Sequence, residues 1–426
     1  MDTERLDAVA GDNAAAYLNE DAAHTQPPIH TKTWFHTGAY LGRERISQQL
    51  SQEYFREPGL SRPEAKDLLL PDTVLPEGLS LAEEREACRA LKGMMLRQEV
   101  YADDADHAGA TLEQRERART PYSVSEQNFT IRRLQPQASN RHGVFFSHPF
   151  EALTYHYERN PADPRIQHAL TLEVDAYGNV LKQAAIGYGR RRQVHLMDGL
   201  GNVQLAANPG LKVLEAADQA KQTTALLTYT ENRFTNAIDS SDQHRTPLPC
   251  EASTYELSGY TATGPAGRYQ AADLVEADPA APGKLRHRFQ VPEVPYEGTA
   301  SGSQRRRPIE QLRTLYRPDD LGASTGNANQ LLTLGELEPM ALPGESYKLA
   351  FTPGLLDAVY QRPRDGQVPE PLLSNAERAA VLGGKGGDQG GYVDLDGNGH
   401  WWLPSGRSFF SSGSADSPAE IGRAHV

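Results

Sequence analysis

The sequence predicts a mainly β protein in which short antiparallel strands form a meander, with one or two helices near the N-terminal third. From Val100 onward, short runs that alternate apolar and polar residues are separated by Gly, Pro, Asn and Asp, as in strands joined by turns. The 37 glycines and 29 prolines among 426 residues make up about 15% of the chain, above the ordinary 12% or so, which suits many tight turns.

The N-terminal third holds the candidate helices. Residues 1–30 are rich in Ala, Asp, Asn and Glu and predict a poorly packed lead-in, with a candidate helix near Ala14 to Leu18. A second candidate helix runs from Arg43 to Phe55. The stretch Pro58 to Pro76 contains four prolines and is interpreted as a linker.

The strongest helix prediction covers Leu79 to Gly93. Ser80 and Glu83 have the spacing of a capping box, in which each side chain bonds to the backbone of the other residue. Leu81, Ala87, Cys88 and Leu91 recur at helical intervals, and Gly93 can take the left-handed conformation past the C-terminal end.

The strand predictions follow the period-two runs. They are Phe129–Ile131, Gly143–Phe146, Leu170–Val174, Val194–Leu196, Leu226–Thr230 and Tyr347–Phe351. Three stretches between the runs are interpreted as loop-like or mobile segments. They are residues 262–283, residues 300–308 with Arg305–Arg307, and the glycine cluster 383–391.

One sequence frame occurs twice. Residues 175–180 and 198–203 share the pattern D-x-x-G-N-V at a distance of 23 residues, and residues 394–399 are a looser relative. In each, Asp and Asn can cap a turn while Gly supplies positive φ between two strands. Two ordinary hairpin turns are the simpler interpretation of this pattern alone. Taken together, the copies indicate a repeated strand-turn-strand sheet, because a period near 20 residues falls in the range of repeat architectures.

Composition narrows the classes of function. The formal net charge of −13 and a sequence pI near 5.5 argue against general binding to phosphate backbones. Two cysteines, Cys88 and Cys250, are too few for a disulfide scaffold or a cysteine-rich zinc site. The mean hydropathy of −0.61 and the absence of a long apolar run predict no membrane helix. The N-terminus predicts no secretory signal, so if the protein is exported, another component exports it.

Metal sites find little support. His142, His148, His156 and His168 have no standard zinc spacing and no nearby cysteine, so local hydrogen bonding is the simpler interpretation. The loop from Asp394 begins like a calcium loop, but Ser405 stands where an EF-hand needs Glu. A looser calcium turn stays an alternative to a plain Asp/Gly turn.

Enzyme motifs are incomplete. Glu336 and Glu338 form an E-x-E frame of the kind used by arginine-modifying ADP-ribosyltransferases, but Ser324-Thr325-Gly326 lies too close upstream for that arrangement. Two exposed acids on a strand or turn are the simpler reading. The sequence also contains no G-x-S-x-G, H-E-x-x-H or Walker loop. We therefore expect no enzyme activity, no cofactor and no metal.

A family resemblance emerges from longer segments. The stretch from Glu151 to Val180, with Tyr157-Glu-Arg159-Asn160-Pro-Ala-Asp163-Pro164-Arg165, resembles the middle region of the B subunit of bacterial insecticidal toxin complexes, the TcdB/TcaC-like proteins related to SpvB. Colinear segments cover about residues 30 to 411. They are Thr33–Gly38, Ala90–Met94, Arg97–Tyr101, Tyr229–Asn232, Leu315–Leu321 and Tyr392–Phe410.

The resemblance implies a structural role in encapsulation. In that family, the B and C subunits form a hollow β-sheet shell that encloses a cleaved toxic fragment of the C subunit. It implies a C-subunit partner, an A-subunit partner through parts of the B subunit absent here, an extracellular destination, and neither nucleic-acid binding nor direct membrane insertion. Members are much longer than 426 residues, so this chain would be the middle/C-terminal linking region.

Boundaries and motif residues follow from the same resemblance. Residues 31–190 correspond to the TcdB-type middle/C-terminal domain, residues 191–411 to a β-rich shell segment leading toward RHS repeats, and residues 412–426 to a tail. The last seven, 420–426, match the translation of a common sequencing adapter and are interpreted as an artefact. The structural motif residues are Tyr157, Arg159, Asn160, Asp163, Pro164, Arg165, His168, Asp175, Gly178, Asn179, Asp394, Asp396, Gly397, Trp401, Trp402 and Gly406.

Two alternative functions stay open at this point. One is an ADP-ribosyltransferase-associated virulence protein, by analogy with SpvB. The other is a carbohydrate-binding β module, suggested by Trp34, Trp401 and Trp402, because tryptophan rings can stack on sugars. In a strand-rich protein, we expect one member of the Trp401-Trp402 pair in the core and the other at an interface.

Overall fold

The computed structural model describes residues 29–406, apart from positions 44, 106, 107, 199, 282, 289, 290, 301, 385 and 388. The candidate helix at Ala14 to Leu18 and the tail after position 406 lie outside the described residues. The chain divides into two compact units, each discontinuous in sequence. Unit 1 contains described residues up to Thr171 with 185–226 and 262–270, and unit 2 contains 172–184, 227–261 and the described residues from Ala271 onward.

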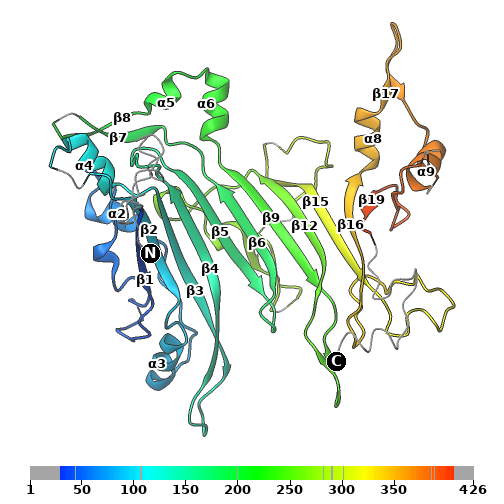
Figure 1. Ribbon diagram of the computed structural model, residues 1–426, viewed down its shortest axis with the longest axis horizontal. Helices are drawn as coiled ribbons and strands as arrows, with labels where there is room; N and C mark the ends of the chain where they lie inside the picture. The colour runs from blue at the N-terminus through cyan, green and yellow to red at the C-terminus, as the bar shows by residue number, and fades with distance from the viewer. Residues whose placement is uncertain are drawn as a thin grey trace, which may run out of the picture. The chain divides into compact units, whose positions relative to one another are not determined.

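Unit 1 is built on antiparallel strands that follow one another in sequence order (Figure 1). Strand β1 pairs with β2, β2 with β3, β3 with β4, and β4 with β5. A separate hairpin joins β7 to β8. The elements are β1 (Ile29–Phe35), η3 (Ser51–Glu53), α2 (Arg62–Asp67), α3 (Leu81–Arg89), β2 (Met95–Ala102), α4 (Leu112–Arg119), β3 (Ser123–Gln135), β4 (Val144–His156), β5 (Arg165–Val174), β7 (Gln193–Met197), β8 (Val203–Ala207), α5 (Pro209–Lys212), α6 (Ala216–Thr223) and η4 (Pro265–Gly267).

Helix α3 confirms the strongest helix prediction. Ser80 and Glu83 form the predicted capping box, and Gly93 has a φ of 84°. The helix turns Ala87 and Cys88 toward Phe129 and Ile131 of β3 and so builds one core of the unit. A second core lies where Leu70 packs on β3 and β4, with Val124, Leu153, Tyr155 and Tyr157 as its other buried members.

The predicted helix at 43–55 was wrong. That segment contains the short 3₁₀ helix η3, and the N–H groups of Ile46, Ser47 and Phe55 bond to carboxylates distant in the chain. The N–H of Ile46 donates to Asp72 and that of Phe55 donates to Glu99, each at 2.8 Å. A backbone whose donors are taken by distant side chains cannot form the continuous i to i−4 bonds of a helix.

The interpretation of 58–76 as a linker was incomplete, because it contains helix α2. Ser61 and Glu64 form a capping box, and Pro63 occupies the first turn, where its missing N–H costs nothing. Arg268 donates to the carbonyl oxygens of Leu68 and Leu69, both at 2.6 Å, which fixes the end of this segment.

Unit 2 has the same antiparallel organisation. Strand β12 pairs with both β9 and β15, β15 pairs with β16, and β16 pairs with β19. The elements are β6 (Val180–Gly187), β9 (Leu226–Phe234), β10 (Ile238–Asp239), β11 (His244–Arg245), β12 (Pro249–Ser258), α7 (Ala271–Leu274), β13 (Val275–Ala277), β14 (Leu285–His287), β15 (Arg305–Tyr316), β16 (Pro343–Phe351), α8 (Pro353–Val359), β17 (Gln361–Arg362), β18 (Glu370–Pro371), α9 (Asn375–Gly383) and β19 (Trp401–Pro404).

The strand pattern confirms the mainly β prediction, with two corrections to the predicted loops. Arg305–Arg307 belong to β15 rather than to a loop, and Arg307 pairs with Glu256 of the neighbouring strand at 2.8 Å. Residues 262–283 contain η4, α7 and β13. Within the described residues, none of the helices is long and apolar enough to cross a membrane.

The repeated D-x-x-G-N-V frame forms the same turn twice. Asp175 Oδ1 accepts the N–H groups of Tyr177 and Asn179, and Asp198 Oδ1 accepts the corresponding pair in the β7–β8 hairpin, all at 2.8 to 2.9 Å. Gly178 has a φ of 91° and Gly201 one of 87°, which L side chains rarely adopt. The hairpin predictions for both copies are confirmed.

Candidate functional site

The predicted motif residues of unit 1 lie around the turn between β4 and β5. Tyr157 is buried directly after β4, and its hydroxyl donates to Glu57 at 2.9 Å. Burial raises the pKa of Tyr157 well above its usual range, because a phenolate would lose its hydration there. Glu57 also accepts two bonds from the Arg191 guanidinium, at 2.6 and 2.9 Å.

The two arginines of this turn bind different carboxylates. Arg165 pairs with Glu158 at 2.8 Å, and both side chains are largely exposed. The Arg159 guanidinium binds both oxygens of Asp104, at 2.6 and 2.7 Å. Arg159 has a φ of 63°, so the turn directs its side chain by an uncommon backbone conformation.

Asn160, Asp163 and Pro164 hold the turn in place. Asn160 accepts the N–H of Ala162 at 3.1 Å. Asp163 accepts the N–H of Arg191 at 3.1 Å and the side-chain amide of Asn208 at 2.8 Å, so it connects the turn to the segments before β7 and α5. Pro164 is buried immediately before β5.

His168 lies in a buried chain of hydrogen bonds that superficially resembles a catalytic triad. Its Nε2 is 3.0 Å from Glu151 and its Nδ1 is 3.0 Å from the Tyr188 hydroxyl. Tyr188 in turn accepts the backbone N–H of Tyr269 at 2.9 Å. Because the His168 side chain has no exposed surface and its Glu151 partner only 4%, this chain fixes strands and does not present a nucleophile to solvent.

The unit 2 motif residues form a second cluster around Arg313. This arginine binds Glu251 at 2.7 Å and Asp396 at 2.8 Å, and it stacks over the ring of Trp402 at 4.5 Å. Asp394 accepts the N–H groups of Asn398 and Gly399. The loop is therefore closed by its own backbone and by Arg313.

The remaining unit 2 residues correct the expectation for the tryptophan pair. Trp401 is 8% exposed and Trp402 is 1% exposed, so both rings are buried and the expected interface member was wrong. Gly397 has a φ of 66°, as a tight turn requires. Gly406 is exposed at the end of the described chain.

The acidic residues considered for ADP-ribosyltransferase chemistry also form hydrogen bonds with nearby backbone groups. Glu336 accepts the N–H of Thr333, and Glu338 accepts that of Asp319 at 2.6 Å. Among the residues that the structure describes, no group of three or more His, Cys, Asp or Glu side chains could hold a metal ion. Burial raises the pKa of Cys88 to about 11, which leaves its thiol protonated and unreactive.

A further cluster, missed at the sequence level, attaches residues 55–70 to the sheet. Arg97 of β2 is 4% exposed and binds Glu99 at 2.7 Å and Glu126 at 2.8 Å. These carboxylates accept the N–H groups of Phe55 and Leu70, each at 2.8 Å. Burial raises the pKa of Glu126, and the Arg97 charge opposes that rise.

The cavity nearest the β4–β5 turn has a volume of about 490 Å³. It is lined by α4, by Arg159 and Asn160 of the turn, and by residues 195–198 of the β7–β8 hairpin. Arg159 is already committed to Asp104, and the Asp198 carboxylate is bonded within its own turn. The cavity therefore brings two motif residues, Arg159 and Asn160, next to the β7–β8 hairpin.

Comparison with known protein families shows which proteins part of this chain resembles. The family described as the insecticide toxin TcdB middle/C-terminal region matches residues 86–246. Over these residues, the chain is similar to that family. The match contains the whole β4–β5 turn and both copies of the repeated frame, and it confirms the resemblance to the B subunit of toxin complexes. No curated protein matches the chain.

Solved TcdB-type structures share the fold of a larger part of the chain. The TcdB2–TccC3–Cdc42 complex is 23% identical with a TM-score of 0.56, and TcdB2–TccC3 without its hypervariable C-terminal region is 22% identical with a TM-score of 0.57. Each likeness covers 92% of this chain and 16% of the other. The Tc holotoxin pore of Photorhabdus luminescens is 21% identical with a TM-score of 0.50, covering 82% of this chain and 15% of the other.

Proposed function

We propose that this TcdB-type chain is a structural segment of a toxin-complex B subunit, and that its sheet helps to form a shell around a cytotoxic fragment of a C subunit. The proposal rests on the contacts that the motif residues make in the structure. Tyr157 and Asp163 each join segments distant in sequence, His168 joins the neighbouring strands β4 and β5, and none of them presents a reactive group. Contacts of this kind hold the strands and turns of a sheet in place.

The proposal includes the arrangement of the chain and its partners. Residues 31–190 act as the TcdB-type middle/C-terminal domain and 191–411 as the shell segment that leads toward RHS repeats. The expected partner is a TccC-type C subunit, because the solved relatives were determined in complex with TccC3. An A subunit would bind through other parts of the B subunit, and the assembled toxin would act outside the producing cell without direct membrane insertion by this chain.

An exchange experiment tests the shell role. Residues 29–406 replace the corresponding part of TcdB2, the chimaera is expressed with TccC3, and the purified complex is treated with protease. We expect a complex in which the hypervariable C-terminal region of TccC3 is protected as it is in the parent complex. TccC3 without that region is the control for the digestion pattern.

Two outcomes would contradict the shell role. One is a complex that assembles but leaves the hypervariable region open to protease. The other concerns the unmodified chain: if it transferred label from NAD to protein, the ADP-ribosyltransferase alternative would replace the structural one. The same preparation on a glycan array tests the carbohydrate-binding alternative, which the buried Trp401 and Trp402 disfavour.

A further inference from the structure

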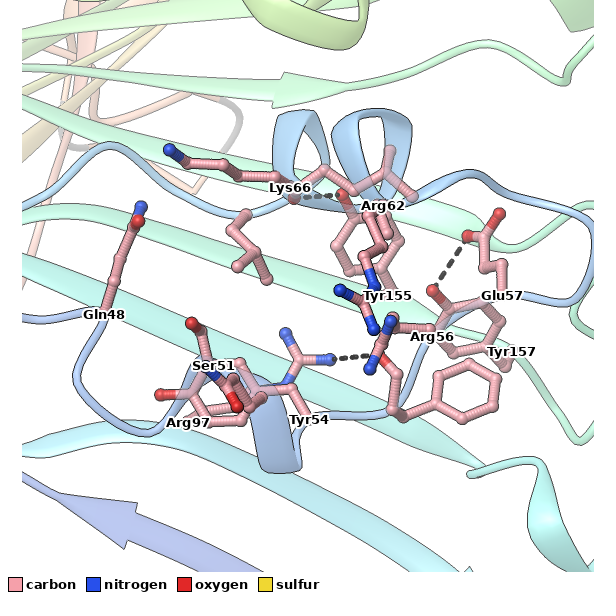
Figure 2. Close-up of a pocket in the computed structure, with 15 residues that line it drawn as sticks. Gln48, Ser51, Tyr54, Arg56, Glu57, Arg62, Lys66, Arg97, Tyr155 and Tyr157 are labelled. Carbon is pink, nitrogen blue, oxygen red and sulfur yellow. Dashed lines mark hydrogen bonds between the residues drawn. The ribbon is translucent and has the colours of Figure 1, made fainter.

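A cavity of about 330 Å³ in unit 1 lies between residues 48–57, helix α2, and strands β2 and β4 (Figure 2). Arg56 enters it from the segment before α2, and Arg62 and Lys66 belong to α2 itself. The rings of Tyr155 and Tyr157 contribute to its wall and are stacked on each other, with centroids 5.6 Å apart and planes 14° from parallel.

The cations of this cavity are not neutralised by the protein. Arg56, Arg62 and Lys66 are exposed, and none of them forms an ion pair with the residues that the structure describes. Such unpaired charges are common on open surfaces, but here three of them line one cavity with aromatic walls. In a chain with a net charge of −13, this is a local concentration of positive charge.

The remaining charged groups of the cavity are already satisfied. Glu57 is the acid among its lining residues, and both of its oxygens are taken, by the Tyr157 hydroxyl and the Arg191 guanidinium. The charge of Arg97 is balanced by Glu99 and Glu126. The cavity therefore keeps the positive charge of Arg56, Arg62 and Lys66.

We propose that this cavity binds a small molecule that carries a phosphoryl group. Guanidinium groups bind phosphate through paired hydrogen bonds, and a multiply charged phosphoryl group balances several cations where one carboxylate balances one. The volume lies at the lower end of small-molecule pockets, roughly 300 to 1,000 Å³, so a small molecule fits it better than a length of polypeptide. The tyrosine rings supply an apolar wall for the rest of the molecule. This binding goes beyond the shell role and does not depend on it.

Isothermal titration calorimetry with inorganic pyrophosphate tests the assignment on the full chain. We expect saturable binding that weakens as NaCl is raised from about 50 to 200 mM, since screening weakens ionic contacts. Arg56→Gln and Arg62→Gln should each weaken binding about tenfold or more, as expected for loss of a charge-assisted pair. The matched control is Arg85→Gln, which removes the same charge from an exposed position of α3 outside the cavity.

Three results would overturn the assignment. The first is no binding of pyrophosphate at millimolar concentration by a chain with an unchanged circular dichroism spectrum. The second is equal weakening by Arg85→Gln, which would show a diffuse effect of net charge. The third is tighter binding of hexaglutamate than of pyrophosphate, which would mark the cavity as a contact for an acidic polypeptide instead.

Discussion

Replacing Arg97 with Met should destabilise unit 1 more than any surface change. The guanidinium is buried between Glu99 and Glu126 and stacks on the Tyr54 ring at 4.8 Å. Methionine keeps much of the apolar stem but removes the charge, which leaves two buried carboxylates without their cation. Breaking a buried ion pair by removing one partner costs about 3 to 5 kcal/mol. That is a large fraction of the roughly 5 to 15 kcal/mol that stabilises a typical domain.

The loss in the Arg97→Met variant should also depend on pH. Burial already raises the pKa of Glu126, and removal of the opposing cation raises it further. An acid whose folded pKa exceeds its unfolded value of about 4.3 is stabilising when protonated, and that stability disappears as pH rises through the folded pKa. The variant should therefore lose more stability relative to the parent at pH 8 than at pH 5.

Urea denaturation at the two pH values, followed by circular dichroism and tryptophan fluorescence, measures both effects. The matched variant is Arg97→Met/Glu126→Gln, which removes one stranded charge and should recover about 1 kcal/mol or more of the loss. The reasoning would be refuted by a loss below about 1 kcal/mol for Arg97→Met, or by a loss that is the same at pH 5 and pH 8.

Three other changes have defined outcomes. Gly178→Val places a β-branched residue at a φ of 91° and should lower the free energy of unfolding by about 1 to 3 kcal/mol. The control is Gly187→Val, because Gly187 lies in strand β6 and a Cβ atom added there would meet no atom within 4 Å. Equal urea midpoints for the two variants would contradict the strained turn. Bonds from the N–H groups of Ser80 and Gln137 lower the pKa of Glu83 to about 2, so the stability that this carboxylate contributes is present above about pH 4.3 and is lost as pH falls toward 2. The Glu83→Gln variant should therefore show a smaller fall in Tm between pH 5 and 2.5 than the parent. Identical falls in Tm would argue against this role. Residues 1–426 expressed alone should self-associate through the outer edge of β1, which has no partner strand within the described residues. Strand edges pair at contact, whereas the repulsion from the net charge of −13 is screened beyond about 8 Å. A stable monomer at high concentration in size-exclusion chromatography with light scattering would contradict this prediction.

Features fixed by near neighbours could be predicted from the sequence. The Asp175–Asn179 turn depends on one carboxylate, two N–H groups and a glycine within five residues, and all of these are visible in the sequence pattern. Helix α3 was predicted because Ser80 and Glu83 mark its start. The same Ser-x-x-Glu signal begins α2 at Ser61 and α9 at Ser374, so a search for capping boxes alone would have found both.

Features fixed by distant partners could not be predicted. The segment from Arg43 to Phe55 has an adequate helical pattern, but Asp72 and Glu99 bind its N–H groups from 26 and 44 residues away. The contact between Glu57 and Arg191 joins residues separated by 134 positions. Nothing local to either residue marks the other, so tertiary contacts decided these parts of the structure.

The tryptophan pair shows why a pattern can identify important residues and still misplace them. Alternation along a strand predicts that consecutive residues face opposite sides, so that one of Trp401 and Trp402 should be more exposed. Both are buried because each side of β19 has a cover: Arg313 stacks on Trp402, while Leu356 and Leu382 from the α8 and α9 helices pack with Trp401. The sequence contains the residues of these helices, but it does not show which side of β19 the helices cover.

The role of the motif residues in the TcdB-type region is better explained by their contacts with residues far away in the sequence than by chemical reactivity. Asp163 connects the β4–β5 turn to Asn208, 45 residues away, and Tyr157 reaches Glu57, 100 residues away. A long meander has mostly contacts between sequential neighbours, so it needs a few contacts of this kind to fix its turns against distant segments. Polar groups suit that task because hydrogen bonds specify one geometry, whereas apolar contacts tolerate several. A sheet whose turns are fixed in this way keeps one geometry, which is what the proposed shell role requires.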